Sequence, residues 1–166
     1  IAQAKTGSGK TAAFAISLLN RLDETQYHTQ ALIVCPTREL AEQVAEEIRR
    51  LARGIPNVKT LTLCGGRPMG PQLASLKRAP HIVVGTPGRL LKHLEKQTLK
   101  INKVETLVLD EADRMLGMGF IEDIDDIDDY LPTTRQTLLF SATYPDEIAQ
   151  LSANFQTDPV DIRIES

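Results

Sequence analysis

One stretch near the start of the sequence decides the fold: Ala4-Lys5-Thr6-Gly7-Ser8-Gly9-Lys10-Thr11. Its small and glycine residues let successive backbone N–H groups turn toward an anion. An amphipathic helical pattern follows at once, with Phe14, Leu18 and Leu22 on one face. A helix that begins here would aim its positive end at the same anion. The stretch therefore predicts a phosphate loop between a strand and a helix. The alternative is a glycine-rich turn before a helix.

Two residues of the loop suit a nucleotide and its metal. Lys10 is placed to reach the β- and γ-phosphates, and the Thr11 hydroxyl is placed to bind Mg²⁺. Ala4 stands where the general pattern has glycine, and alanine also satisfies the tight turn from strand to loop. In the alternative interpretation, Lys10 is merely solvated.

Apolar, β-branched runs alternate with helical patterns along the rest of the chain. Leu40, Val44, Ile48 and Leu51 fall on one helical face. The expected strands are Ala31–Cys35, Lys59–Cys64, His81–Val84, Thr106–Leu109, Thr137–Ser141 and Val160–Ile164. This alternation predicts an α/β fold with a mostly parallel sheet and helices on both faces. The sequence has no internal repeat or long linker, so residues 1–166 are expected to form one domain.

Composition narrows the classes of partner. Apolar residues make up 42% and charged residues 25% of the chain, and its net charge is −3. No run approaches the ~18 apolar residues of a membrane span, so no membrane partner is expected. The charge gives no overall attraction to nucleic acid, so such a site has to be local. Cys35 and Cys64 each end an apolar run and are interpreted as buried free thiols in a reducing, cytoplasmic compartment; a disulfide or metal pair is the alternative.

A polar or glycine-bearing cluster follows the short strand remnant before Ala4 and each expected strand as far as Thr137–Ser141. In parallel sheets ligands bind at the carboxyl ends of the strands, so these clusters should converge on one edge. They are Ala4–Thr11, Pro36–Leu40, Gly65–Gly66, Thr86–Arg89, Asp110–Asp113 and Ser141–Thr143. Their convergence carries more weight than any single motif.

The acidic cluster suits the metal side of such a site. The apolar run Leu107–Leu109 leads into Asp110-Glu111-Ala112-Asp113. Asp110 suits the second Mg²⁺ anchor, usually through a coordinated water. Glu111 is placed to orient and deprotonate the attacking water. A solvated acidic helix start is the alternative, because carboxylates are also favoured there.

Taken together and in order, these motifs resemble the first RecA-like domain of DEAD-box RNA helicases. The resemblance covers essentially the whole chain. The flanks Gln3–Thr11, with Lys5, and Thr62–Gly66 look most like the bacterial DbpA-type subgroup.

The resemblance implies a role for each motif position. ATP would be bound by Thr6, Gly7, Ser8, Gly9, Lys10 and Thr11. Lys10, Asp110 and Glu111 would be catalytic, with Mg²⁺ at Thr11 and, through water, at Asp110. Asp113 would hydrogen-bond with Ser141 and Thr143, which couples hydrolysis to RNA. The single-stranded RNA backbone would be held, without regard to sequence, by Pro36, Thr37, Arg38, Glu39, Gly65, Gly66, Thr86, Pro87, Gly88 and Arg89. Arginines suit phosphates, while hydroxyl and backbone N–H groups suit phosphate and 2′-OH.

The implied activity is RNA-dependent ATP hydrolysis that remodels or unwinds RNA, in ribosomal RNA or ribosome assembly. Such proteins also carry an upstream glutamine motif that reads adenine, and a second RecA-like domain with an arginine finger. Neither is found in these 166 residues. The chain is therefore expected to be a piece truncated at its N-terminus and nearly inactive alone. Two alternatives stay open, namely an RNA or nucleotide clamp without turnover and another phosphate-loop enzyme such as a kinase or a DNA translocase.

Three other features are interpreted as structural. The carboxylates between residues 122 and 129 share a helical pattern with Phe120, Ile124, Ile127 and Leu131, so they are expected on its solvated face. His28, His81 and His93 are expected at the surface or at strand edges. Met115 and Met118 are expected to pack beneath the helix that follows Asp113.

Overall fold

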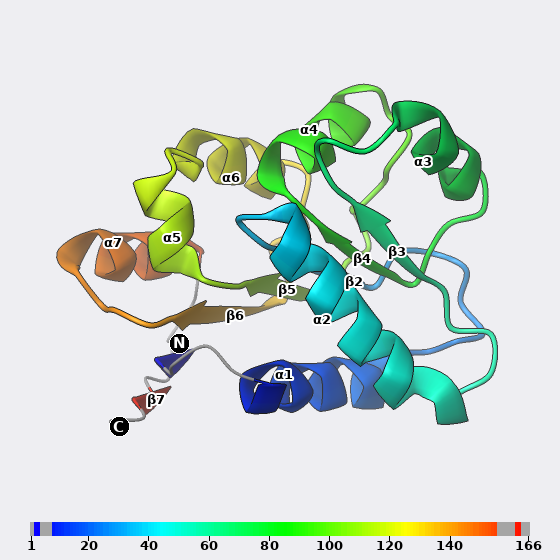
Figure 1. The fold of residues 1–166 in the computed structure, drawn as a ribbon, viewed down its shortest axis with the longest axis horizontal. Coiled ribbons are helices and arrows are strands. Elements are labelled where there is room, and N and C mark those ends of the chain that lie inside the picture. The colour runs from blue at the N-terminus through cyan, green and yellow to red at the C-terminus, as the bar shows by residue number, and fades with distance from the viewer. Residues whose placement is uncertain (1, 4–7, 156–161, 164–166) are drawn as a thin grey trace.

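The computed structural model describes residues 2–3, 8–155 and 162–163, with side chains for residues 9–155. Its strands form one seven-stranded sheet in the order β3-β4-β2-β5-β6-β1-β7 (Figure 1). All six pairings are parallel. The strands are β1 (Ala2–Gln3), β2 (Ala31–Val34), β3 (Thr60–Leu63), β4 (Ile82–Gly85), β5 (Thr106–Leu109), β6 (Gln136–Ser141) and β7 (Ile162–Arg163).

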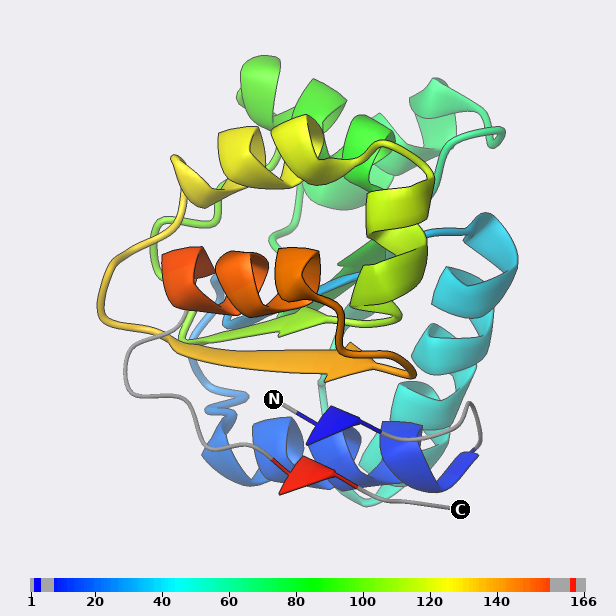
Figure 2. The same ribbon diagram turned by 90° about the vertical axis from the view of Figure 1, so that its left-hand side faces the viewer.

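Helices cover both faces of this sheet. Two of them, α1 (Ser8–Arg21) and α2 (Arg38–Leu51), lie on one face, and the others lie on the opposite face (Figures 1 and 2). These others are α3 (Met69–Leu76), α4 (Pro87–Glu95), α5 (Ala112–Gly117), α6 (Ile121–Asp128) and α7 (Asp146–Phe155). A short 3-10 turn, η1 (Ala52–Gly54), follows α2. No helix in the described part is long and apolar enough to cross a bilayer.

The period-two alternation of β2 explains this three-layer arrangement. Leu32 and Val34 point into the core beneath α4–α7, whereas Ala31, Ile33 and Cys35 point into the core beneath α1 and α2. Because both faces are covered, every residue of β2 is buried. The predicted α/β architecture is confirmed, and β5 begins and ends at the predicted residues.

The structure confirms some of the features interpreted as structural and contradicts others. Ile124 and Ile127 are buried on α6, and both cysteines are buried free thiols. The expectation for Met118 was wrong, because α5 ends at Gly117 and leaves that side chain 48% exposed. The expectation for His93 was also wrong, since it lies on the inner face of α4 and is fully buried.

Candidate nucleotide site and nucleic-acid interface

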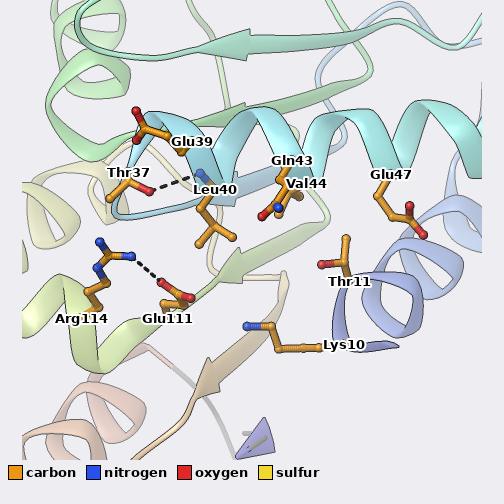
Figure 3. Close-up of a pocket in the computed structure, with 10 residues that line it drawn as sticks. All are labelled: Lys10, Thr11, Thr37, Glu39, Leu40, Gln43, Val44, Glu47, Glu111 and Arg114. Carbon is orange, nitrogen blue, oxygen red and sulfur yellow. Dashed lines mark hydrogen bonds and ion pairs between the residues drawn. The ribbon is translucent and has the colours of Figure 1, made fainter. Parts of the chain in front are cut away.

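A cavity of about 600 Å³ lies at the carboxyl edge of the sheet (Figure 3). Side chains from the start of α1, one face of α2 and the start of α5 line it. They are Lys10, Thr11, Thr37, Glu39, Leu40, Gln43, Val44, Glu47, Glu111 and Arg114. Thr6 and Gly7 lie outside the described residues, and of Ser8 the structure describes only the backbone, which begins α1. Gly9 lies in the first turn of this helix.

Lys10 and Asp110 form an ion pair across the site. Their Nζ and Oδ1 atoms are 2.7 Å apart, and the side chains are 8% and 0% exposed. Asp110 follows β5 and is sealed by the sheet, and this burial raises the pKa of its carboxyl group. The Lys10 ammonium and the Glu111 backbone N–H act in the opposite direction. The lysine thus neutralises a carboxylate that is buried from bulk solvent.

The second carboxylate oxygen of Asp110 supplies a test for magnesium. Oδ2 is buried and has no hydrogen-bond partner within the described residues. A buried acceptor of this kind normally has a partner, and a metal-bound water would provide one. No group of three His, Cys, Asp or Glu side chains in the described part could hold a metal without other ligands. Mg²⁺ typically takes one or two protein ligands together with waters and substrate phosphates. Asp110 and the cavity-lining Thr11 fit that donor set.

Glu111 occupies an unusual backbone position at the start of α5. Its φ of 50° and ψ of 51° are left-handed, which non-glycine residues rarely adopt. The side chain lines the cavity, and its Oε2 lies 3.3 Å from Arg114 Nη1. The turn therefore places a carboxylate in the cavity directly beside the buried Asp110. Arg114 was missed in the sequence, although its position one helical turn after Glu111 could have revealed it.

The Ser141–Thr143 segment reaches the start of α5. Thr143 Oγ1 donates to Asp113 Oδ2 over 2.9 Å. The structure differs from expectation for Ser141, whose Oγ donates to the Thr143 carbonyl oxygen over 2.6 Å. A hydroxyl has one proton, so this local bond replaces the expected donation from Ser141 to Asp113.

The Pro36–Glu39 segment begins α2 at the same edge. Thr37 has extended backbone angles, and its Oγ1 accepts the Leu40 N–H over 3.2 Å, which caps the helix. Pro36 is buried. Arg38 Nη2 lies 3.4 Å from Glu39 Oε1, which is a loose ion pair. The cap thus fixes the direction in which the exposed Glu39 and the partly exposed Arg38 leave the helix start.

The glycine pair and the Thr86–Arg89 segment are joined by hydrogen bonds. The Gly65 N–H donates to Thr86 Oγ1 over 3.0 Å. Gly66 has a φ of 78°, and a Cβ there would approach Arg38 Nη1 to 3.1 Å. Pro87 and Gly88 form the first turn of α4, with Gly88 exposed. Arg89 Nη1 donates to the Arg67 carbonyl oxygen over 2.7 Å.

The expected residues therefore fall into two groups. Lys10, Thr11, Asp110 and Glu111 lie at or beside the cavity, and the three segments expected to bind RNA lie at neighbouring strand ends. Thr37 and Glu39 line the cavity as well, which the sequence did not indicate. Gln43 and Glu47 also line it and were missed, although they lie about one helical turn apart on α2.

Comparison with known proteins gives consistent results. A model of the DEAD/DEAH box helicase family matches residues 1–151. The chain is 61% identical over 164 residues to the ATP-dependent RNA helicase DbpA of Escherichia coli, covering 99% of this chain and 36% of that protein. It is 52% identical over 166 residues to the ATP-dependent RNA helicase CshA of Listeria monocytogenes, covering 100% of this chain and 32% of that protein. The chain thus spans about a third of the length of these curated relatives.

Solved structures show the same fold. A DEAD box protein from the hyperthermophile Methanococcus jannaschii has a TM-score of 0.92 and 46% identity, over 99% of this chain and 44% of that one. Saccharomyces cerevisiae Dbp5 bound to RNA and ADP BeF3 has a TM-score of 0.87 and 28% identity, over 99% of this chain and 41% of that one.

Proposed function

The chain belongs to the DEAD/DEAH box helicase family, and on this premise we propose that it is the ATP-binding, first RecA-like domain of an ATP-dependent RNA helicase. The observation that carries the proposal is the ion pair between Asp110, which is buried and has one carboxylate oxygen without a described partner, and Lys10, which lines the same cavity as Glu111. This set supplies a cation for phosphates, a metal anchor and a base for water.

Lys10 would change its partner when ATP binds. In the structure it pairs with Asp110, so its ammonium has to turn toward the β- and γ-phosphates when ATP binds. Magnesium held by Thr11 and, through water, by Asp110 would neutralise developing phosphate charge. It would also replace the positive charge that Asp110 loses when Lys10 moves. The nucleotide contacts from Thr6, Gly7, Ser8 and Gly9 belong to the same proposal.

Glu111 would orient and deprotonate the attacking water. Its carboxylate lines the cavity beside Asp110, and its contact with Arg114 limits its rotation. General-base action by such a side chain typically contributes ~10²–10⁴ in rate.

The RNA would lie along the adjoining strand ends. Arg38 and Arg89 would pair with phosphates, and the backbone at Gly65, Gly66 and Gly88 permits close approach. These contacts fix position without reading bases. Pro36, Thr37, Glu39, Thr86 and Pro87 would shape this interface by starting α2 and α4.

Asp113 and Thr143 would couple the two sites. Their hydrogen bond links α5, which begins next to Glu111, to the segment after β6. Ser141 would contribute by fixing the Thr143 backbone. The partner in this coupling would be a second RecA-like domain in a longer protein, and the relatives' greater length supports this.

Two finer proposals concern the task of the protein and its compartment. As a finer task we propose remodelling of ribosomal RNA or ribosome assembly, which the resemblance of the sequence to the DbpA-type subgroup implies. The buried free thiols of Cys35 and Cys64 support a reducing, cytoplasmic setting.

A substitution of Glu111 tests the proposal. In the full-length protein, Glu111→Gln should retain binding of ATP and Mg²⁺ but lower RNA-stimulated hydrolysis by at least ~10²-fold, because the amide cannot accept a proton. The measurements are nucleotide affinity and steady-state ATPase activity with single-stranded RNA. Glu46→Gln is the matched control, since Glu46 is exposed on α2 and pairs with Arg49.

Three results would contradict the proposal. Parental turnover in Glu111→Gln would show that Glu111 is not the base. Equal stimulation of the parent by RNA and by DNA of the same length would favour a DNA translocase, and absence of turnover in the parent would favour a clamp.

A further inference from the structure

A buried polar relay lies beneath the Thr86–Arg89 segment. It consists of Gln72 on α3, His93 on α4 and Thr98 in the loop after α4. Gln72 is 6% exposed and His93 is 0% exposed. Polar side chains buried this deeply need hydrogen-bond partners. The chain of hydrogen bonds through these side chains ends at the Arg89 guanidinium. The nucleotide site does not use any of the three residues.

Two contacts fix the orientation of the Gln72 amide. Its Oε1 lies 3.1 Å from Arg89 Nη1, and its Nε2 lies 3.1 Å from the Cys64 carbonyl oxygen. A guanidinium only donates and a carbonyl only accepts. The amide oxygen must therefore face Arg89, and the amide nitrogen must face Cys64.

The amide in turn fixes the His93 tautomer. His93 Nε2 lies 2.8 Å from Gln72 Oε1, so this ring nitrogen carries a proton. The Thr98 hydroxyl has one proton and two acceptors within reach, His93 Nδ1 at 2.9 Å and the His93 carbonyl oxygen at 3.1 Å. A ring with its single proton on Nε2 offers Nδ1 as the nearer acceptor. Burial, together with the nearby cations Arg89 and Lys96, lowers the pKa of His93. The ring is therefore held neutral, with its proton directed at Gln72.

The relay determines which edge of Arg89 is free to bind. Arg89 Nη1 has two hydrogens, and it has two acceptors, the Arg67 carbonyl oxygen and Gln72 Oε1. Within the described residues this leaves the edge formed by Nε and Nη2. Two parallel donors of this kind match two oxygens of a phosphate. Fixing an arginine before binding also removes part of the entropy cost of ordering it.

We propose that Gln72 and His93 are positioning residues that hold Arg89 ready for a backbone phosphate. Through the Cys64 carbonyl the same relay joins Arg89 to the Gly65–Gly66 loop, which Thr86 also contacts. The two segments then bind RNA as one preformed unit. This inference rests on the RNA-binding role proposed above for Arg89.

A double-mutant cycle in the full-length protein tests the inference. Gln72→Met keeps the length of the side chain and removes the amide. We expect Gln72→Met and Arg89→Ala each to raise the half-saturating concentration of single-stranded RNA about ten-fold, equivalent to ~1.4 kcal/mol. The turnover rate at saturating RNA should change far less in Gln72→Met. The double variant should be no worse than Arg89→Ala, whereas independent effects would multiply to about a hundred-fold.

A second pair of variants separates positioning from general stability. His93→Gln returns an N–H donor near the position of Nε2 and should bind RNA within about three-fold of the parent, whereas His93→Leu should lose about ten-fold. Thr29→Val is the control, because Thr29 is buried and bonds the Pro80 carbonyl oxygen at the opposite edge of the sheet. It should lower the melting temperature without changing RNA half-saturation.

The outcomes distinguish a failure of this inference from a failure of the RNA-binding role on which it rests. If Arg89→Ala weakens RNA binding but Gln72→Met does not, or if their effects multiply, the relay does not position Arg89. If Gln72→Met does not fold, equal RNA binding by His93→Gln and His93→Leu overturns the inference. If Arg89→Ala itself binds RNA normally, the proposed RNA interface fails at its premise.

Discussion

At the scale of the residue, the Lys10–Asp110 ion pair connects stability with function. Asp110 is fully buried, and its burial raises the pKa of the carboxyl group while Lys10 opposes that rise. Removing one partner of a buried pair leaves the other charge uncompensated, which typically costs ~3–5 kcal/mol. The phosphate-binding lysine should therefore also stabilise the fold when no nucleotide is bound.

We predict that Lys10→Met is destabilised in a pH-dependent way. Without the ammonium, the pKa of folded Asp110 rises further above that of an unfolded aspartate, about 3.9. A group with a raised folded pKa loses its stabilising contribution as pH increases through that pKa. The free energy of unfolding should thus fall by ~3 kcal/mol at pH 8 and by clearly less at pH 5.

Denaturant titrations at both pH values measure this. Lys10→Met/Asp110→Asn, which removes the carboxylate charge as well, should recover most of the loss at pH 8. An equal deficit at pH 5 and pH 8 would show that the lysine stabilises by packing rather than by charge.

Residue types could be predicted at this scale, but their partners could not. Strand exits and motif spacing indicated Lys10, Asp110 and Glu111. Nothing in the spacing indicates that Lys10 turns to Asp110, because a hundred residues separate them and the pairing depends on the buried end of β5. The Ser141 hydroxyl was misassigned for the same reason, since a local carbonyl competes for its proton.

At the scale of the element, the end of β4 sets the position of α4. Gly85 pairs with β2 and β3 and is directly followed by Thr86, which precedes α4. A Cβ at Gly85 would lie 2.5 Å from the Leu63 carbonyl oxygen and 2.7 Å from Leu90 Cδ2. Leu63 is paired with Gly85 itself, so its carbonyl oxygen can move away only if the pairing of β3 with β4 is disturbed. The glycine therefore allows α4 to pack closely against β3 and β4.

We predict that Gly85→Ala lowers the free energy of unfolding by ~1–3 kcal/mol. The added methyl group would displace the neighbouring atoms, and over-packing a core typically costs this much. RNA affinity should fall too, since Thr86 and Arg89 would shift with α4. Gly70→Ala is the control, because a Cβ there meets nothing within 4 Å and alanine has a higher helix propensity than glycine. Equal melting temperatures for the two variants would contradict the close-packing argument.

Elements were predictable where the sequence has a clear period. The strands lie within two residues of their predicted limits wherever the structure describes them, and α2 has the predicted apolar face. The helix α3 was not indicated, because Gly70 and Pro71 are typical of a turn. Its first turn tolerates proline, and the helix is held by Gln72 contacts that only the folded chain brings together.

At the scale of the whole molecule, the sheet gathers segments distant in sequence at one edge. The described cavity has two cationic side chains, Lys10 and Arg114, and both are already ion-paired, with Asp110 and Glu111. A bound triphosphate carries more negative charge than these two can balance. The net charge of −3 adds no general attraction for nucleotide or RNA.

We predict that these 166 residues alone hydrolyse ATP at least ~10³-fold more slowly than the full-length protein, because the proposed second domain would supply an arginine finger and such a residue is typically worth this much in rate. They should also not separate RNA duplexes. Steady-state ATPase assays with and without single-stranded RNA, run beside the full-length protein, measure this. Parent-like, RNA-stimulated turnover would show that this domain needs no second domain for catalysis.

The left-handed backbone of Glu111 has a consequence for selection. At this φ a residue with a side chain lowers the stability of the fold by roughly 1–2 kcal/mol, whereas glycine does not. Glycine is therefore the residue that thermal stability alone favours at position 111, and glycine cannot activate water. A library screened only for heat resistance should drift toward inactive sequences at this position. The glutamate of this chain therefore lowers stability at a position where its carboxylate lines the cavity.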